Sequence, residues 1–440
     1  MKDFKILFTD DVFVSNSGLI IASRILNDTK IFCRINRVSK IKKSFGVISD
    51  YDIIKVFIAL IILGKPDYDS IEQYRNDQYF KKVLKIKKVP SSPTLRQRIE
   101  TFSEEMWEEL QWINAEILKQ NFEGETITIN EQAFNVIDSD VTPMDNSKTK
   151  KEGVARTYKH VDGFAPMMSY VGKSGLMLNN ELRNGDSHSN CEGTLEYFSR
   201  TIELMRYVSN FPILMVLDSG NDDSKLVSML NKERVGFIIK RNLRREPIEK
   251  YIEHAKTTAE GKDVVELYKG CTKYYSKWHR SIKSESGEYL DIPISVVVTE
   301  KLMDKHSQQT LIPDVEVEVY WNPLDLSAKE TEEIYHKHGT MEQYHSEFKS
   351  DLDLERLPSG KFNCNYTIML MGMLSFNILR IIGNKLLKTN AVPGKRGKRL
   401  RLRTVILNVM YMAGQFIQHS RQYFIKLFRG NLWTESFAMI

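Results

Sequence analysis

Cysteine is scarce in this chain and never forms a recognisable metal or redox pair. The 440 residues contain only Cys33, Cys191, Cys271 and Cys364, which lie far apart, and no Cys-x-x-Cys motif occurs. We therefore do not expect a disulfide framework or a thiolate zinc site, and a reducing cytoplasm is the expected compartment. The first eleven residues carry charges throughout, so we also expect no signal peptide.

Long apolar runs are rare as well. Residues 53–63 form a run that is too short to span a bilayer. Residues 367–382 form a longer one, but Asn377 and Arg380 interrupt it, so we expect a buried core helix and no membrane partner. The chain also lacks internal repeats and low-complexity tracts. Neither Ser187 nor Ser219 lies in a Gly-x-Ser-x-Gly elbow, which argues against a serine nucleophile.

The residues that are present favour a large globular protein. Hydrophobic residues make up 42% of the chain and aromatic residues 10%, which is enough for a substantial core. The length suits roughly two to four domains. The formal net charge of +6 is a mild basic excess, which is compatible with a polyanionic partner without establishing one.

The pattern along the chain changes from helical to β-rich and back. Helical periodicity dominates up to about residue 124, and β-branched residues predict strands from residue 125. The continuous apolar run at residues 211–217 predicts a buried parallel strand. Polar strands follow between residues 241 and 323, and helices return from residue 324 to the end. This order favours a mixed sheet flanked by helices.

A basic helix is predicted near residue 92. Ser92 is the expected N-cap and Pro93 the first helical residue, with Arg96 and Arg98 exposed on the helix that follows. The preceding helix and this one resemble a helix-turn-helix, in which both arginines would contact DNA. An ordinary helical bundle fits the same stretch equally well.

Carboxylates at predicted strand ends are the clearest chemical feature. Asp138 and Asp140 are two residues apart in one strand, so both side chains face the same side of the sheet. Asp218 closes the next strongly apolar strand, and Glu342 lies on a helix predicted for residues 334–360. Converging carboxylate oxygens would suit Mg²⁺, and two such ions suit in-line displacement at phosphorus. The alternative role of each Asp is to form a turn or to cap a helix.

The helix predicted for residues 334–360 carries a polar stripe, because about 3.6 residues complete each turn. The stripe consists of His338, Glu342, His345 and Lys349. Four other residues fall beside it and are expected to pack the helix against the sheet: Met341, Tyr344, Phe348 and Leu352.

The stretch YHKHGTMEQYHSEFK, residues 335–349, resembles the tyrosine-arginine-glutamate-lysine signature of DDE-type transposases of bacterial insertion sequences. Its spacing is Tyr335, two residues, His338, three residues, Glu342, six residues and Lys349. VIDSDVT and VLDSGN resemble the two aspartate strands of that family. SNSGLIIASRIL, PSSPTLRQRIETF, NNELRNGDSHS and DLDLERLPSG resemble further landmarks. The similarity therefore spans nearly the whole chain in the family's order.

The resemblance implies a ribonuclease-H-like catalytic core that a β-rich insertion interrupts. The expected fold class is mixed α/β: this core with an all-β insertion, flanked by helical N- and C-terminal regions. The expected divisions are a DNA-binding region at 1–124, the first part of the core at 125–240, the insertion at 241–323, the Glu-bearing helix of the core at 324–360 and a basic region at 361–440.

Carried over residue by residue, the resemblance implies that Asp140, Asp218 and Glu342 are catalytic. They would bind two Mg²⁺ ions, for which Mn²⁺ would substitute. Asp140 is preferred to Asp138 because the family's first Asp is followed within two residues by Thr or Ser, and Thr142 fits. Asp138 stays open as the alternative ligand.

Tyr335 and Lys349 match the signature, which implies that both bind the strand at the transposon end. The signature's Arg is replaced by His338. Because Arg grips phosphate through two hydrogen bonds and neutral His donates only one, Lys337 is an alternative phosphate contact here.

Further DNA contacts are expected from Trp278 and from a basic run near the C-terminus. In related transposases a Trp of the insertion stacks on a flipped base, whereas packing in the core is the alternative role for Trp278. The basic run is expected to contact DNA phosphates, and the alternative is that it forms a solvated loop. Its members are Lys395, Arg396, Lys398, Arg399, Arg401 and Arg403.

The expected function is that of a transposase that binds terminal inverted repeats, hydrolyses the end phosphodiesters and transfers the 3′-OH ends to target DNA. The expected partners are double-stranded DNA and a second copy of the chain, because two ends need two active sites. The expected location is the bacterial cytoplasm, at the nucleoid. The alternative is a domesticated, catalytically inactive DNA-binding derivative.

A di-iron site is a further alternative, since Glu333-x-x-His336 and Glu342-x-x-His345 each match the Glu-x-x-His motif. Nine residues separate the two motifs, so on one continuous helix they face opposite sides. A shared iron pair would therefore require a helix break at Gly339.

Overall fold

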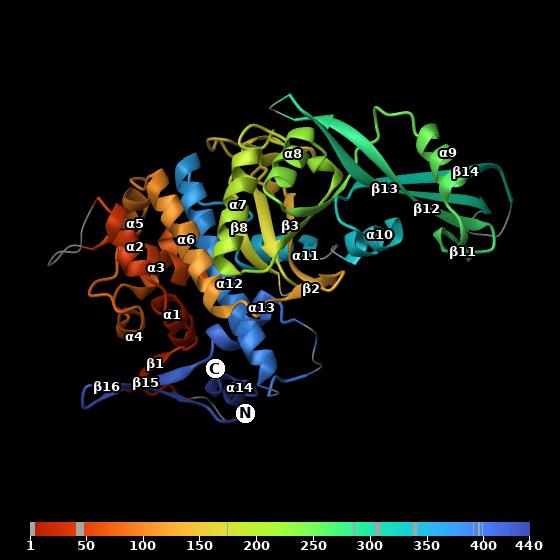
Figure 1. The fold of residues 1–440 in the computed structure, drawn as a ribbon. Helices are drawn as coiled ribbons and strands as arrows, with labels where there is room; N and C mark the ends of the chain where they lie inside the picture. Colours follow the sequence, from red (N-terminus) through yellow and green to blue (C-terminus); the bar gives the residue numbers. More distant parts are fainter. Residues whose placement is uncertain are drawn as a thin grey trace. The chain divides into compact units, whose positions relative to one another are not determined.

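The chain divides into two compact units in the computed structural model (Figure 1). The first comprises Met1–Asn121, Met144–Val154 and His345–Ile440, and the second comprises Phe122–Pro143 and Ala155–Tyr344. The structure describes residues 5–40, 48–173, 175–284, 287–303, 309–337, 341–389, 391–394, 397 and 399–440.

The first unit is a helical bundle organised around one long helix. Its helices are α1 (Leu19–Asn27), α2 (Ile31–Val38), α3 (Asp50–Ile62), α4 (Gln78–Val83), α5 (Ser92–Ile99), α6 (Glu104–Asn121), α12 (Phe362–Lys388), α13 (Leu402–Val405) and α14 (Thr434–Ala438), with a 3₁₀ helix at Tyr68–Tyr74. α12 packs against α3 and α6, which come from the other end of the sequence (Figure 1).

α12 is the buried helix that its apolar composition predicts. It is long and apolar enough to cross a membrane, but 94% of its most apolar window is buried inside the protein. Its polar side chains have partners there: the Asn377 amide donates to Oδ1 of Asn114 over 2.6 Å, and the Ser375 hydroxyl donates to the Met371 carbonyl over 2.9 Å. These hydrogen bonds offset the free-energy cost of burying the polar side chains.

Three local expectations for the first unit were wrong. The N-cap of α5 is Ser91, whose hydroxyl accepts the Thr94 N–H, and Ser92 is already helical. Arg98 is not exposed, because its guanidinium pairs with the buried Asp50. The C-terminal region is not helical to its end: β15 (Gly414–His419) and β16 (Gln422–Leu427) form an antiparallel hairpin, and β1 (Val12–Val14) pairs with β15.

The second unit is built on a mixed sheet. Among the described residues, its strands follow the order β11-β12-β13-β14-β10-β9-β3-β7-β8, with β2 also paired to β3. They are β2 (Thr126–Ile129), β3 (Gln132–Val141), β7 (Met167–Val171), β8 (Leu176–Glu181), β9 (Ile213–Leu217), β10 (Gly236–Lys240), β11 (Val264–Tyr268), β12 (Cys271–Lys283), β13 (Tyr289–Met303) and β14 (Gln309–Trp321). β9 is fully buried and parallel to both β3 and β10, as the apolar run predicts.

Helices complete the second unit. They are α7 (Thr194–Val208), α8 (Ser224–Lys232), α9 (Glu249–Thr258), α10 (Ala328–Lys337) and the first four residues of α11 (Met341–Ser346), with 3₁₀ helices at Ser219–Asn221 and Gly261–Asp263. The short strands β5 (Ala155–Arg156) and β6 (Asp162–Phe164) form a separate hairpin. The pair Met144–Asp145, β4, belongs to the first unit. The mixed α/β fold class is therefore confirmed.

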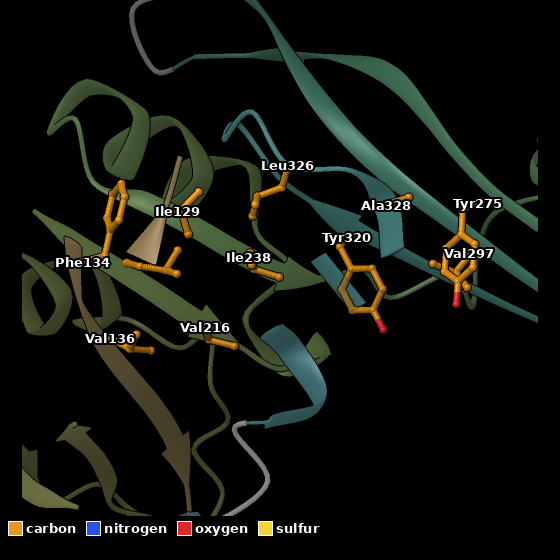
Figure 2. Close-up of a cluster of buried hydrophobic side chains, with 11 residues drawn as sticks. Ile129, Phe134, Val136, Val216, Ile238, Tyr275, Val297, Tyr320, Leu326 and Ala328 are labelled. Carbon is orange, nitrogen blue, oxygen red and sulfur yellow. The ribbon is translucent and has the colours of Figure 1, made fainter. Parts of the chain in front are cut away.

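The segment expected as an insertion continues the central sheet. β14 pairs with β10 in antiparallel register, so that Ile239 lies opposite Trp321. One hydrophobic cluster runs from Val136 and Ile238 to Tyr320 and Val297 (Figure 2). The segment also contains the helix α9, whose buried face packs on β12 and β13.

The helix predicted for residues 334–360 is shorter and less regular than expected. α10 ends at Lys337, and His338, Gly339 and Thr340 lie outside the described residues. α11 passes into a π-helical turn at Glu347–Asp351, and residues 352–360 contain no helix. Tyr344 packs near the sheet as predicted, but Phe348 does not: its ring faces Phe376 of α12, with centroids 6.3 Å apart.

Candidate active site

Two carboxylates lie side by side at the carboxyl ends of parallel strands. In the register of β3 and β9, Asp138 pairs with Val216 and Ser139 pairs with Leu217. Asp140 and Asp218 are each the next residue, so they reach the same level at this edge of the sheet. Asp138 points to the same face but lies two residues deeper, and only 8% of its surface is exposed.

The turn after β9 orients Asp218. Oδ1 of Asp218 accepts the side-chain amide of Asn221 over 2.7 Å and the Gly220 N–H over 3.1 Å. Asn221 is fully buried, so its amide is a fixed donor. Asp218 therefore also has the capping role that was its alternative assignment.

Tyr344 attaches the start of α11, and with it Glu342, to the second unit. Its hydroxyl donates to the Lys173 carbonyl over 3.0 Å, and its ring lies 5.2 Å from the ring of Tyr170 on β7. Gly175 makes room for this ring, because a Cβ at that position would lie 2.3 Å from it. Glu342 itself is exposed.

The charges of the three carboxylates act on one another. Burial, the Asp218 carboxylate and the Glu342 carboxylate together raise the pKa of Asp140 to about 7. Burial also raises the pKa of Asp218. A divalent cation would relieve this repulsion, and a set of carboxylate oxygens is what Mg²⁺ and Mn²⁺ prefer, so the donor set fits such an ion.

The raised pKa of Asp140 predicts a pH-dependent metal affinity. Below about pH 7 a cation must displace a proton from Asp140, so the affinity for Mn²⁺ should rise roughly tenfold per pH unit up to pH 7 and then level off. In the metal-free protein, the proton that Asp140 retains stabilises the fold. This stabilisation is fully present below the ordinary pKa of 3.8 and is lost as the pH rises from there through about 7.

Isothermal titration calorimetry with Mn²⁺, in buffers that differ in ionisation enthalpy, measures both the affinity and the released proton. Asp140→Asn should bind the ion more weakly and without this pH dependence. A wild-type affinity that does not change between about pH 5 and 7 would contradict the assignment of the proton to Asp140.

A second cluster of possible ligands lies elsewhere in the second unit. The ligand atoms of Glu318, Glu332 and His336 lie within 4.8 Å of one another. Glu318 already pairs with Lys240, and Glu332 pairs with Lys273. Because these ammonium groups neutralise the carboxylates, the cluster is an ion-pair network joining α10 to the sheet.

The di-iron alternative gains no support from the Glu-x-x-His motifs. His336 lies 3.8 Å from Glu332, whereas Glu333 is near Lys337 at 4.0 Å. Glu342 belongs to the second unit and His345, which is buried, to the first.

Two aromatic residues predicted to contact DNA have partners within the second unit. Tyr335 packs against Tyr320, with ring centroids 4.9 Å apart, and burial together with Asp218, Glu318 and Asp140 raises its pKa to about 12. Trp278 stacks on His254 with centroids 4.4 Å apart. One face of the indole is therefore covered in this structure.

The predicted basic contacts differ in their accessibility. Arg96 and Arg403 are exposed. Arg399 pairs with Glu347, and Arg401 binds Asp351 through Nε and Nη2 at 2.9 Å each, so both have structural partners. Lys349 lies 3.9 Å from Glu355. His338, Lys395, Arg396 and Lys398 lie outside the described residues.

Sequence reasoning overlooked three residues around the carboxylates. Asn221 was part of the quoted VLDSGN stretch but received no role. Tyr158 and Lys159 lie in a hairpin turn: the Lys159 ammonium lowers the pKa of Asp140, and the Asp140 carboxylate raises the pKa of Tyr158. A Tyr-Lys pair between two short strands is a weak signal, because only the fold brings it near the three acids.

Comparisons with known proteins show which family the chain belongs to. A family profile described as "Transposase DDE domain group 1" matches residues 2–440. No curated protein matches the chain. Solved structures that match include the piggyBac transposase, determined by cryo-EM as a synaptic complex with hairpin DNA: identity is 12%, coverage is 91% of this chain and 80% of that chain, and the TM-score is 0.45. Because the profile spans nearly the whole chain, the protein belongs to the family of DDE-domain transposases, group 1.

Proposed function

We propose that the protein is an active DNA transposase of a bacterial insertion sequence, with Asp140, Asp218 and Glu342 as its catalytic acids. The observation that carries this proposal is the register of β3 and β9, which sets Asp140 beside Asp218. The effect of both Asp218 and Glu342 on the pKa of Asp140 supports the same grouping.

The three carboxylates would hold two divalent cations, Mg²⁺ in the cell, which would stabilise the charge of a displacement at phosphorus. Asp140 would have to lose its proton to act as a ligand. The buried amide of Asn221 keeps Asp218 in one orientation, which fixes the ligand geometry. Asp138 is buried two residues before Asp140 in β3, and we assign it a supporting role behind the catalytic carboxylates.

The proposed reaction has two steps at one site. In the first, the oxygen of water attacks the phosphorus at the element end, and the 3′ oxygen leaves as a 3′-OH. In the second, this 3′-OH attacks a phosphodiester of target DNA, so one phosphodiester forms as another breaks. Joining two ends requires two active sites, and we therefore propose a homodimer on DNA.

Residues of each unit would contact DNA. Among the basic contacts predicted from the sequence, Arg96 and Arg403 are exposed and would contact phosphates. Tyr335 would reach the strand at the element end from beside Asp218. Trp278 would need to leave His254, or use its free face, to stack on a base.

A cleavage assay on DNA that spans both flanks of the gene tests the proposal. With Mg²⁺ or Mn²⁺ we expect cuts at a pair of inverted repeats, each leaving a 3′-OH, and no cuts with EDTA. Tight binding of these ends without any cut would instead indicate a domesticated, inactive protein. The absence of both binding and cutting would refute the proposed substrate.

A further inference from the structure

A tight hairpin turn lies beside the three carboxylates and has no part in the chemistry proposed above. It joins β5 to β6 at residues 157–161. The Thr157 N–H donates to the Val161 carbonyl over 2.9 Å, and the Thr157 hydroxyl donates to the same carbonyl over 2.8 Å. The His160 N–H closes the turn onto the Thr157 carbonyl over 2.9 Å. The turn is therefore well defined, with Tyr158, Lys159 and His160 at its tip.

The hairpin is braced from behind by the stretch NNELRNGDSHS. A Cβ at Gly185 would lie 2.2 Å from the carbonyl oxygens of both Ala155 and Gly163, so only glycine allows this close approach. Phe164 at the end of β6 forms a bridge with the neighbouring Asn184. A braced hairpin of this kind holds its tip in a fixed place.

The tip reaches the strand that carries Asp140. The Tyr158 hydroxyl donates to the Val141 carbonyl over 3.4 Å, while the Val141 N–H donates to Oδ1 of Asp140 over 2.7 Å. Burial and the carboxylates of Asp140, Asp218 and Glu342 raise the pKa of Tyr158 to about 12, so the phenol stays neutral.

The exposed part of the tip has the chemistry of a nucleic-acid contact. Tyr158 is 56% exposed although its hydroxyl is bound, so much of its ring is open to solvent. Lys159 is exposed, with its ammonium 5.8 Å from the centre of that ring, and its charge lowers the pKa of Asp140. An aromatic face next to an ammonium suits a base next to a phosphate.

We propose that the turn at residues 157–161 binds the DNA strand that carries the scissile phosphate, with Tyr158 stacked on a neighbouring base and Lys159 paired with a backbone phosphate. This inference rests on the proposed function and assigns two further positioning residues to it. Lys159 also offsets the repulsion between the phosphate and the three carboxylates.

The test uses the full chain and the gene's flanking DNA, with 2-aminopurine placed at successive positions across each end. Binding is measured by anisotropy and stacking by 2-aminopurine fluorescence, and cleavage is measured separately. Tyr158→Ala should weaken binding about 5- to 100-fold and abolish the quenching at one position, whereas Tyr158→Phe should retain both. Lys159→Ala should reduce the slope of log affinity against log salt concentration by about 1, which corresponds to one lost phosphate contact. Lys159→Arg should restore the slope.

Tyr289→Ala and Lys283→Ala are matched controls, because these exposed residues pair across β12 and β13 and should leave every readout unchanged. If the wild type cuts and Tyr158→Ala behaves like it, the inference is wrong and the proposed function stands. If the wild type binds without cutting and Tyr158→Ala weakens binding, the inference holds and the proposed catalysis fails. A Tyr158→Phe variant as weak as Tyr158→Ala would show a structural role through Val141 and overturn the inference.

Discussion

Replacing Glu342 with Gln is expected to abolish DNA cleavage by this protein while leaving its affinity for the same DNA largely unchanged. The amide keeps the size of the carboxylate and loses its charge, so the site should hold its cations less well. Removing a single preorganised electrostatic group in an enzyme commonly lowers the rate about 10²- to 10³-fold, and a lost metal ligand should lower it at least as much. Asp140→Asn and Asp218→Asn should have the same effect.

Glu333→Gln is the matched control, since Glu333 is an exposed residue of α10 that lies near Lys337. Its cleavage rate should equal that of the wild type. The measurement is single-turnover cleavage of labelled element ends, with binding followed by gel shift. Cleavage by Glu342→Gln at a rate within tenfold of the wild type would remove Glu342 from the catalytic set.

Replacing Arg380 with Met is expected to lower the free energy of unfolding by about 3–5 kcal/mol. The Arg380 side chain is fully buried in the first unit, and its guanidinium donates to Oε2 of Glu347 over 2.9 Å. Glu347 is also buried, and it accepts the Leu402 N–H over 2.9 Å and pairs with Arg399. Without Arg380 the carboxylate keeps only part of its compensation, which is why the loss should be large.

Urea denaturation of the wild type and variant measures this difference. Arg75→Met is the control in the same unit, because the pair of Arg75 with Glu72 is solvent-exposed and should contribute at most about 1 kcal/mol. Equal losses from the two substitutions would mean that the buried pair contributes no more than a surface pair.

The part of the site that comes from strands was predictable, because its signals are local. The run ending in Leu217 is apolar at every position, which indicates a strand buried on both faces, and Asp218 follows it directly. Parallel neighbours end at the same edge of a sheet, so the approach of Asp140 to Asp218 followed from two strand assignments. Membership in the DDE transposases, predicted from short stretches of sequence, is confirmed by the family profile.

The ion pairs were not predictable, because their partners are distant in sequence. Arg98 lies 48 residues from Asp50, Arg399 lies 52 residues from Glu347, and Arg401 lies 50 residues from Asp351. In a sequence, a cluster of arginines that binds DNA looks the same as a cluster that pairs with carboxylates of the same chain. Only the fold shows which carboxylates lie near the arginines.

The hairpin of β15 and β16 was missed for a different reason. Its two turn residues, Ser420 and Arg421, have φ values of 48° and 67°, which is the left-handed conformation that tight hairpins need. Asn-Gly or Asp-Gly usually marks such a turn, and neither occurs here. The apolar residues of QFIQHSRQYFIK do not alternate strictly with polar ones, so the stretch was open to a helical interpretation.

The pairing of β14 with β10 has a consequence for the solubility of shortened forms of the protein. β10 is flanked by β9 on one side and by β14 on the other, so removing residues 241–323 would uncover a row of unpaired N–H and C=O groups along an apolar strand. Bare strand edges of this kind template association between chains. Within the segment that interrupts the core, β14 thus covers the edge of β10. A minimal catalytic core would need another way to cover this edge before it could remain monomeric in solution.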